Sequence, residues 1–146
     1  MKTSLRLPAL SAGLFALIVA VPVAAAVPAG QAAIETVAEQ TGFRRTGRYD
    51  EVERLCAAYA ARWPAQVRCF EFGRSAENRP LLALAASADG TLDPETARAR
   101  QRPVVLFQGG IHAGEIDGKD AGFIALREIL EGRTSRGALA RTTVLF

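Results

Sequence analysis

Residues 103–146 carry the pattern that decides the fold, and they read PVVLFQGGIHAGEIDGKDAGFIALREILEGRTSRGALARTTVLF. The apolar run 103–107, which ends shortly before two glycines, predicts a short strand. Apolar side chains then recur at helical spacing over residues 120–131, and Gly132 is placed to cap that helix at its C-terminus. Residues 142–146 are apolar and partly β-branched, which predicts the start of another strand. A strand, a loop, a helix and a strand in this order predict a βαβ unit, and therefore an α/β fold with at least one parallel pair of strands.

The residues before this unit predict a helix and a hairpin that complete the sheet. Apolar side chains recur on one helical face over residues 48–63, and a proline then ends the predicted helix. Residues 67–72 and 81–86 read as two strands joined by a turn, and we expect them to pair antiparallel. Residues 89–102 form a polar connection. We therefore expect four strands in one sheet, with the two helices packed on it.

The composition favours one folded domain and argues against nucleic-acid binding. The chain has 146 residues, of which 49% are hydrophobic and 23% charged, a combination that excludes wholesale disorder and supplies a sizeable core. The 18 basic and 15 acidic side chains give a net charge of +3. Lys2 and Arg6 lie in a segment that we expect to be removed, and without them 16 basic groups face 15 acidic ones, giving +1. Such a balance offers no electrostatic footprint for a polyanion.

The first 26 residues have the organisation of a secretory signal peptide. Basic side chains come first, an uncharged stretch follows at 7–30, and alanines at positions 24–26 offer a cleavage site. An uncleaved membrane anchor is the alternative, because the uncharged stretch is long enough to span a bilayer. The prolines of this stretch and the small residues at its end favour cleavage near Ala26. We therefore expect a mature protein that is periplasmic or secreted and is not stably inserted in a membrane.

The mature chain divides into a leading segment and one domain. Residues 27–45 read as a polar segment, with a short helix expected at about 32–39, and the domain extends from residue 46 to 146. The chain ends inside the predicted strand 142–146, without a polar tail, and a domain rarely ends in this way. We therefore expect an N-terminal fragment of a longer protein, with its last strand forming an open apolar edge that is prone to aggregation.

The two cysteines, Cys56 and Cys69, are 13 positions apart. Export permits a disulfide and an even number of cysteines fits one, whereas two buried thiols are the alternative. We expect the two residues to come close in space, because the helix that carries Cys56 must pack on the sheet that contains Cys69. No second pair of cysteines or histidines supplies the spacing of a zinc knuckle.

The only histidine, His112, follows the predicted strand 103–107, at the end of the sheet where open α/β folds place their ligands. Glu115 comes three residues later, and an imidazole nitrogen together with a carboxylate suits a cation such as Zn²⁺. The simpler interpretation is a surface histidine that forms ordinary hydrogen bonds. The position of His112 directly after a strand favours the metal site.

Two further observations bear on this metal site. Three glycines of the loop would permit unusual backbone dihedrals and a close approach of the backbone to a metal: Gly109, Gly110 and Gly114. Catalytic zinc normally has three protein ligands and a water molecule, and this chain offers no second histidine. We therefore expect the remaining ligand to lie beyond Phe146.

Two stretches of the sequence resemble the carboxypeptidase A-like zinc metallocarboxypeptidases, the peptidase M14 type. The run from Pro103 to Ala121, an apolar strand followed by GGIHAGEIDGKDA, resembles the first zinc-binding motif of this family. Residues 72–81, FGRSAENRPL, resemble its early hairpin, whose turn usually reads Gly-x-Ser-x-x-Gly-Arg-Pro. Asn78 stands where glycine is usual, and asparagine tolerates the same left-handed conformation. The resemblance covers the chain from about Thr41 to its end.

This resemblance implies a fold and a chemistry for residues 46–146. The implied fold is the truncated N-terminal part of a mixed-sheet α/β domain of the phosphorylase/hydrolase-like kind. The implied activity is that of a zinc metallocarboxypeptidase acting on peptide or protein C-termini, with Zn²⁺ held by His112, Glu115 and a later histidine. The general base and the groups that bind the substrate's carboxylate would also come later. The resemblance therefore implies no catalytic residue within this chain and no activity of the chain alone.

Two other functions compete with this assignment. Zinc amidohydrolases that remove acyl groups from amino acids share the His-x-x-Glu pattern, but they typically carry Gly-Asn between the two ligands. This chain has Ala113-Gly114 there, which favours the carboxypeptidase. The third interpretation is a non-enzymatic exported α/β module in which His112 binds no metal. The presence or absence of a third ligand and a general base discriminates among the three.

Several charged residues near the motif have no assigned catalytic role. Asp117, Lys119 and Asp120 lie close to the expected start of the helix, where they could support the ligands. Four arginines further on match none of the family's motifs, and we expect them on a solvated face: Arg127, Arg133, Arg136 and Arg141.

Overall fold

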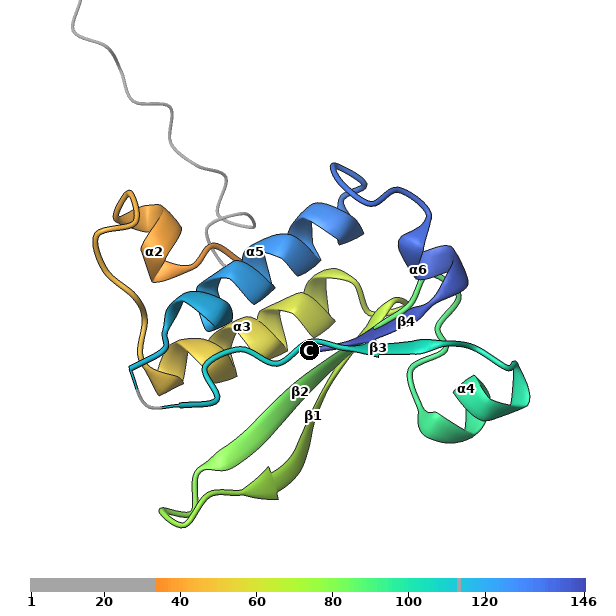
Figure 1. The fold of residues 1–146 in the computed structure, drawn as a ribbon, viewed down its shortest axis with the longest axis horizontal. Helices are drawn as coiled ribbons and strands as arrows, with labels where there is room; N and C mark the ends of the chain where they lie inside the picture. Colours follow the sequence, from red (N-terminus) through yellow and green to blue (C-terminus); the bar gives the residue numbers. More distant parts are fainter. Residues whose placement is uncertain (1–33, 113) are drawn as a thin grey trace, which may run out of the picture.

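The chain folds into a mixed α/β structure in which helices pack against a four-stranded sheet (Figure 1). This structure is a computed structural model that describes residues 34–112 and 114–146, so the predicted signal peptide lies outside the described residues. The helices are α2 Val37–Gln40, α3 Tyr49–Arg62, α4 Pro94–Ala99, α5 Asp117–Leu130 and α6 Ala138–Arg141. The strands are β1 Val67–Arg74, β2 Pro80–Ala86, β3 Val104–Leu106 and β4 Thr143–Leu145.

The sheet is mixed and has the strand order β1-β2-β4-β3. β1 and β2 form an antiparallel hairpin, β4 is antiparallel to β2, and β3 runs parallel to β4. In the parallel pair, Val105 lies opposite Val144 and Leu106 lies opposite Leu145. The predicted βαβ unit is therefore confirmed, and so is the place of the 103–107 strand in the sheet.

The edges of the described sheet are β1 and β3, and the last strand is not at an edge. We expected residues 142–146 to form an open apolar edge, and this expectation is wrong, because β4 lies between β2 and β3 with Thr143 and Val144 buried. The edge at β3 instead carries three apolar residues, whose exposed fractions are 53%, 40% and 59%. Strand order depends on pairings between residues far apart in the chain, and the local pattern of residues does not encode it.

Helices α3 and α5 lie side by side on one face of the sheet (Figure 1). The hydroxyl of Tyr59 on α3 donates a hydrogen bond to the carbonyl oxygen of Phe123 on α5, at 2.6 Å. The two rings also meet edge to face, with centroids 5.5 Å apart. The buried core around this contact consists of Ile34, Leu55, Cys56, Tyr59, Val67, Leu84, Ala86, Phe123, Leu126, Leu139 and Val144.

Several helices differ from those that the sequence predicts. α5 begins at Asp117, three residues before the predicted start, and ends one residue early. The polar connection 89–102 contains α4, and the loop before β4 contains α6. In α4 the Asp93 side chain accepts a hydrogen bond from the Thr96 amide at 2.8 Å, and Pro94 occupies the first turn, where its fixed φ favours a helix. Within the described residues, no helix is long and apolar enough to cross a bilayer.

The turn between β1 and β2 follows the expected pattern. Asn78 adopts a left-handed φ of 61°, the conformation for which glycine is usual at this position. The Ser75 amide donates to the Arg79 carbonyl oxygen at 2.9 Å and closes the turn. A bulge between Glu71 and Gly73 precedes it. β1 extends to Arg74, two residues beyond its predicted end.

Cys56 and Cys69 form a disulfide, with their Cα atoms 5.4 Å apart. The bond joins α3 to β1, as the expected packing of that helix on the sheet requires. The predicted proximity of the two cysteines is confirmed, and the alternative of two buried thiols is excluded.

Arg127 is buried, although we expected it on a solvated face. Its guanidinium donates to the carbonyl oxygen of Ile34 at 3.1 Å and forms an ion pair with the carboxylate of Glu39. Thr36, also buried, completes the cluster through a reciprocal capping interaction with Glu39 at the start of α2. This buried ion pair ties the segment before α3 to the third turn of α5, and a partner 88 positions away cannot be read from local sequence.

The disulfide should contribute measurably to the stability of the fold. A closed loop of this length corresponds to about 3 kcal/mol of lost conformational entropy in the unfolded chain. We expect the Cys56→Ala/Cys69→Ala double variant to unfold at a lower urea concentration by about that free energy. Reductant should lower the wild-type midpoint to the value of the variant and leave the variant unchanged. A wild-type midpoint that does not respond to reductant would contradict this contribution.

The Glu39 ion pair predicts a specific loss of stability in acid. Burial opposes ionisation of Glu39, but hydrogen bonds from Arg127 and Thr36 outweigh burial and lower the pKa of its carboxyl below the ordinary 4.5. A lowered pKa gives stability that is fully present above pH 4.5 and is lost as the pH falls through the folded-state value. The difference in free energy of unfolding between wild type and Glu39→Gln should therefore be constant at neutral pH and shrink below pH 4.5. A difference that stays constant into the acid range would show that Glu39 does not contribute in this way.

Candidate metal centre

The loop between β3 and α5 begins where the sheet ends. The amide of Phe107 donates to the carbonyl oxygen of Leu145 at 2.8 Å, so the chain is still held beside β4 one residue after β3. Gly110 and Gly114 then adopt left-handed φ values of 70° and 93°. These conformations are unfavourable for other residues, and they let the chain reverse direction before α5 begins.

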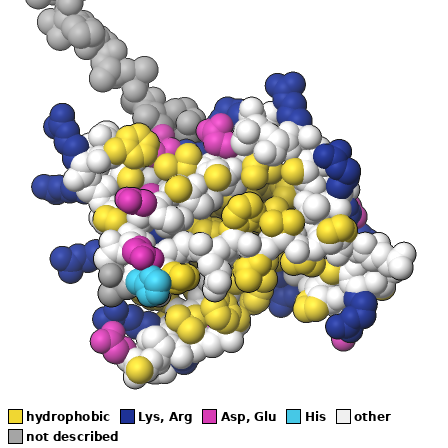
Figure 2. All heavy atoms as spheres, in the orientation of Figure 1, with side chains coloured by type: hydrophobic (Ala, Val, Ile, Leu, Met, Phe, Trp, Pro, Cys, Tyr) yellow, Lys and Arg dark blue, Asp and Glu magenta, His cyan; other side chains and the backbone are white. Residues whose placement is uncertain are grey.

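The structure brings the two predicted ligands together in this loop. His112 Nδ1 lies 3.0 Å from Glu115 Oε1, and the Glu115 amide donates to the His112 carbonyl oxygen at 3.2 Å. Both side chains are exposed, at 71% for His112 and 60% for Glu115. Figure 2 shows the histidine at the surface, next to an acidic side chain. The pair is therefore open to a ligand or a substrate from solvent.

The donor atoms of this pair fit two positions of a zinc site. Two ligands that each lie about 2.0–2.2 Å from one Zn²⁺ are about 3–3.5 Å apart, and the separation of His112 Nδ1 and Glu115 Oε1 falls in that range. A neutral imidazole and an ionised carboxylate are both ordinary zinc ligands. The third ligand has no counterpart here, because residues 34–112 and 114–146 contain no group of three or more side chains that could hold a metal ion.

Glycines close the base of the loop by a direct contact between backbones. A Cβ atom on Gly109 would lie 2.4 Å from the carbonyl carbon of Gly118, and one on Gly118 would lie 2.9 Å from Gly109 Cα. The first residues of the loop therefore rest directly on the first turn of α5. We expected unusual dihedrals at Gly109, Gly110 and Gly114, and only the last two show a positive φ. Gly109 is required for the close approach instead.

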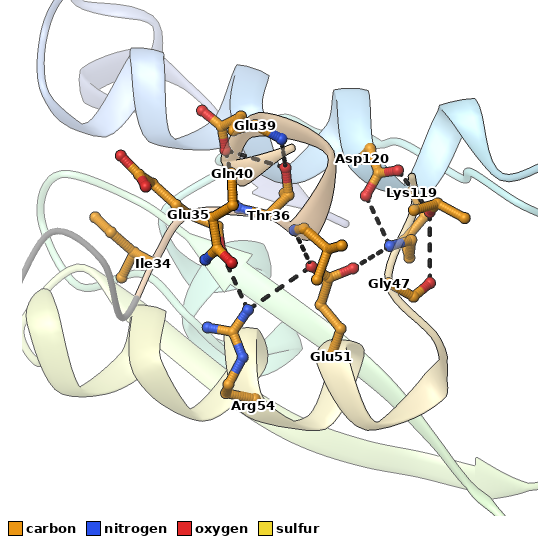
Figure 3. Close-up of polar contacts among 12 residues, drawn as sticks. Ile34, Glu35, Thr36, Glu39, Gln40, Gly47, Glu51, Arg54, Lys119 and Asp120 are labelled. Carbon is orange, nitrogen blue, oxygen red and sulfur yellow. Dashed lines mark hydrogen bonds and ion pairs between the residues drawn. The ribbon is translucent and has the colours of Figure 1, made fainter. Parts of the chain in front are cut away.

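The first turn of α5 takes part in a cluster of charged side chains that is largely buried (Figure 3). The Lys119 ammonium is 2.7 Å from Asp120 Oδ1 and also forms an ion pair with Glu51 of α3. The Thr46 hydroxyl donates to Asp120 Oδ2 at 2.6 Å. The sequence indicated Lys119 and Asp120 as supporting residues, but Glu51 was missed. Its place one turn before Leu55, on the apolar face of α3, is the signal that could have found it.

The other charged residues near the motif lie at the surface. Asp117 is exposed in the first turn of α5. Arg133 is exposed and pairs with Glu128, and Arg136 donates to the carbonyl oxygen of Gly132 at 3.0 Å. Arg141 is exposed as well. For three of the four arginines the expected solvated position is confirmed, and Arg127 is the exception.

An apolar groove of about 600 Å³ leads from the sheet to the loop. The sheet hairpin borders it on one side and residues 106–111 border it on the other. Leu84 and Phe146, which exchange both backbone hydrogen bonds, also line this groove. Figure 2 shows hydrophobic side chains gathered over this central part of the face.

Comparisons with known proteins agree with the motif and with the topology. The family model of zinc carboxypeptidases matches residues 52–146. Among solved structures, the carboxypeptidase A from Helicoverpa armigera matches with a TM-score of 0.58 and 23% sequence identity. That match covers 68% of this chain but only 23% of the other chain. A comparison with curated proteins gives no match.

These findings support family and fold to different degrees. The structural match has an identity too low to show more than the fold, and it identifies the mixed sheet with its helices as resembling the carboxypeptidase A fold. The family model extends over about two thirds of the chain and includes both His112 and Glu115. The chain therefore belongs to the zinc carboxypeptidase family.

Proposed function

We propose that this chain is part of an exported zinc-dependent metallocarboxypeptidase that removes C-terminal amino acids from peptides or proteins. The observation that carries the proposal is the 3.0 Å separation of His112 Nδ1 and Glu115 Oε1 at the carboxyl end of β3, in a member of the zinc carboxypeptidase family. The family supplies the reaction class, and the geometry supplies the two residues that would take part.

In this proposal His112 and Glu115 hold the zinc ion. When bound, zinc acts as a Lewis acid that polarises a carbonyl group and lowers the pKa of a bound water molecule. To bind through Nδ1, the His112 imidazole carries its proton on Nε2. Glu115 must be ionised, and it contributes the negative charge of the pair.

The loop itself gives these two side chains access and orientation. Both are largely exposed, so a peptide C-terminus can approach them from solvent. The turn that links the Glu115 amide to the His112 carbonyl oxygen keeps the two side chains on the same side of the loop. Metal sites gain affinity when their ligands are held in place before the metal binds.

We further propose that the 146-residue chain does not hydrolyse peptides by itself. His112 is the only histidine, both cysteines are in the disulfide, and the described residues contain no set of three metal ligands. The chain also spans only 23% of the Helicoverpa armigera carboxypeptidase A that it matches. The third ligand and the general base would then come from residues that this chain does not contain.

Export is the remaining part of the proposal. The organisation of residues 1–26 supports it, as does the disulfide between Cys56 and Cys69, because stable disulfides form in oxidising compartments. A periplasmic or secreted enzyme would meet peptides released outside the cytoplasm.

Zinc binding tests the two ligands directly. Calorimetry gives the Zn²⁺ affinity of every variant, including one that lacks the imidazole. Because His112 is the only histidine in the sequence, the same Zn²⁺ can also be followed at that ring by NMR in untagged protein that retains it. We expect His112→Ala and Glu115→Gln each to weaken binding by at least about tenfold, as loss of metal-site residues generally does. Gln108→Ala, an exposed change in the same loop, is the matched control and should bind Zn²⁺ like wild type. Equal affinities for all four proteins would contradict the assignment.

Hydrolysis tests the activity. A longer protein that contains this chain with its complete carboxypeptidase domain should release C-terminal residues from a peptide, and a chelator should abolish that release. The 146-residue chain should release none under the same conditions. Chelator-sensitive hydrolysis by the short chain would show that the site is complete without further residues. An inactive longer protein that retains His112, Glu115 and a third ligand would overturn the carboxypeptidase function.

A further inference from the structure

We propose that Lys119 is a positioning residue for the metal loop, the loop at residues 107–116 that carries His112 and Glu115. Its ammonium group, held between Glu51 and Asp120, would fix the first turn of α5 and through it the relative placement of His112 and Glu115. The inference rests on the proposed function, since it concerns the same two ligands. It assigns a role to a buried cation that the proposed chemistry leaves unused.

The cluster is buried and its charges are interdependent (Figure 3). The exposed fractions of the side chains are 3% for Glu51, 14% for Lys119 and 10% for Asp120. One ammonium therefore lies between two carboxylates with little solvent around them. Removing it would leave two like charges together in a poorly solvated place, which is strongly unfavourable.

Glu51 is anchored independently of Lys119. Its carboxylate also accepts a hydrogen bond from the Val37 amide at 2.5 Å, and Arg54 Nη2 lies 3.7 Å from it. Gly47 makes room for it, because a Cβ atom on that glycine would lie 2.0 Å from Glu51 Oε2. Glu51 is thus a fixed point on α3 against which Lys119 can hold α5.

The first turn of α5 passes this constraint to the ligand loop. Lys119 is four residues after Glu115, and its amide donates to the carbonyl oxygen of Ile116 at 3.2 Å. The preceding residue, Gly118, lies against Gly109 on the opposite side of the loop. A rotation of the first turn would therefore move both ends of the loop that carries the ligands.

A second close approach couples the inside of the loop to Glu115. A Cβ atom on Gly110 would lie 3.2 Å from the carbonyl oxygen of Glu115. The part of the loop that follows β3 therefore contacts the part that leads into α5 at two places. Gly109 contacts Gly118, and Gly110 contacts Glu115. The placement of the loop therefore depends on where α5 begins.

The sign of the effect separates positioning from simple electrostatics. Lys119 is a cation near a proposed cation site, and removal of its charge would strengthen metal binding if only the Coulomb interaction mattered. Loss of positioning would lower the affinity for the metal instead, because ligand side chains that are mobile before binding must be ordered when the metal binds. A weaker site in a variant without the lysine charge therefore indicates positioning.

The experiment measures Zn²⁺ affinity at the His112 imidazole by NMR in untagged full-chain protein. We expect Lys119→Met to weaken binding by about tenfold or more, and Lys119→Arg to recover most of the loss. Arg127→Met is the matched control, because it removes a buried cation from the same helix, twelve positions after Glu115. It should lower the stability of the fold and leave the affinity within about twofold of wild type.

Each outcome separates this inference from the function on which it rests. If Lys119→Met does not fold, Lys119→Met/Glu51→Gln removes both charges together and carries the same test. Affinity that is unchanged or increased in a folded Lys119 variant, with wild-type binding still dependent on His112, would overturn the positioning role alone. Wild-type protein whose Zn²⁺ binding does not depend on His112 would overturn the proposed function.

Discussion

The structure depends on the polar contacts that fix the position of α5. This helix is the crossover between the two parallel strands, and it begins directly after the loop that carries His112 and Glu115. Polar contacts hold it along its length. Lys119 pairs with Glu51 in the first turn, the carbonyl oxygen of Phe123 accepts from Tyr59 in the middle, and Arg127 pairs with Glu39 in the third turn. Apolar burial supplies most of the packing energy, but it is not directional. The hydrogen-bonded pairs fix how far the helix slides and rotates on α3 and α2.

Much of the fold could be predicted from the sequence, because its signals are local. The strand before the loop, the periodic helix after it and the apolar run at residues 142–146 each show a pattern within a few residues. The predictions that were wrong concern contacts between residues far apart in the chain. β4 lies inside the sheet and β3 at its edge because β4 pairs with β2, almost 60 residues earlier in the chain. The helix α4 was missed for a different reason, since residues 89–102 are mostly polar, although Pro94 is favourable in a first turn.

The residues of the candidate site also divide into those that local sequence identifies and those that only the fold brings together. His112 and Glu115 could be found from their spacing and from their place after a strand, and the structure puts their donor atoms 3.0 Å apart. Glu51 could not be found so readily, since it is 68 positions from Lys119 and only the folded chain brings them together. The contact of Gly109 with Gly118 is also a property of the fold, although both glycines are visible in the motif. Sequence patterns thus identify groups that meet a ligand more easily than groups that hold them.

A metal site that faces a macromolecular substrate has two opposing requirements. Its ligands must be exposed, and exposed loops are ordinarily mobile because few contacts restrain them. At the proposed site the two requirements fall on different residues: His112 and Glu115 are open to solvent, whereas Glu51 and Asp120 are buried and Lys119 is mostly buried. The glycine contacts connect the two layers without side chains that would fill the space between them. The buried residues can therefore hold the loop in place, which leaves its outer surface free for the peptide substrate that we propose.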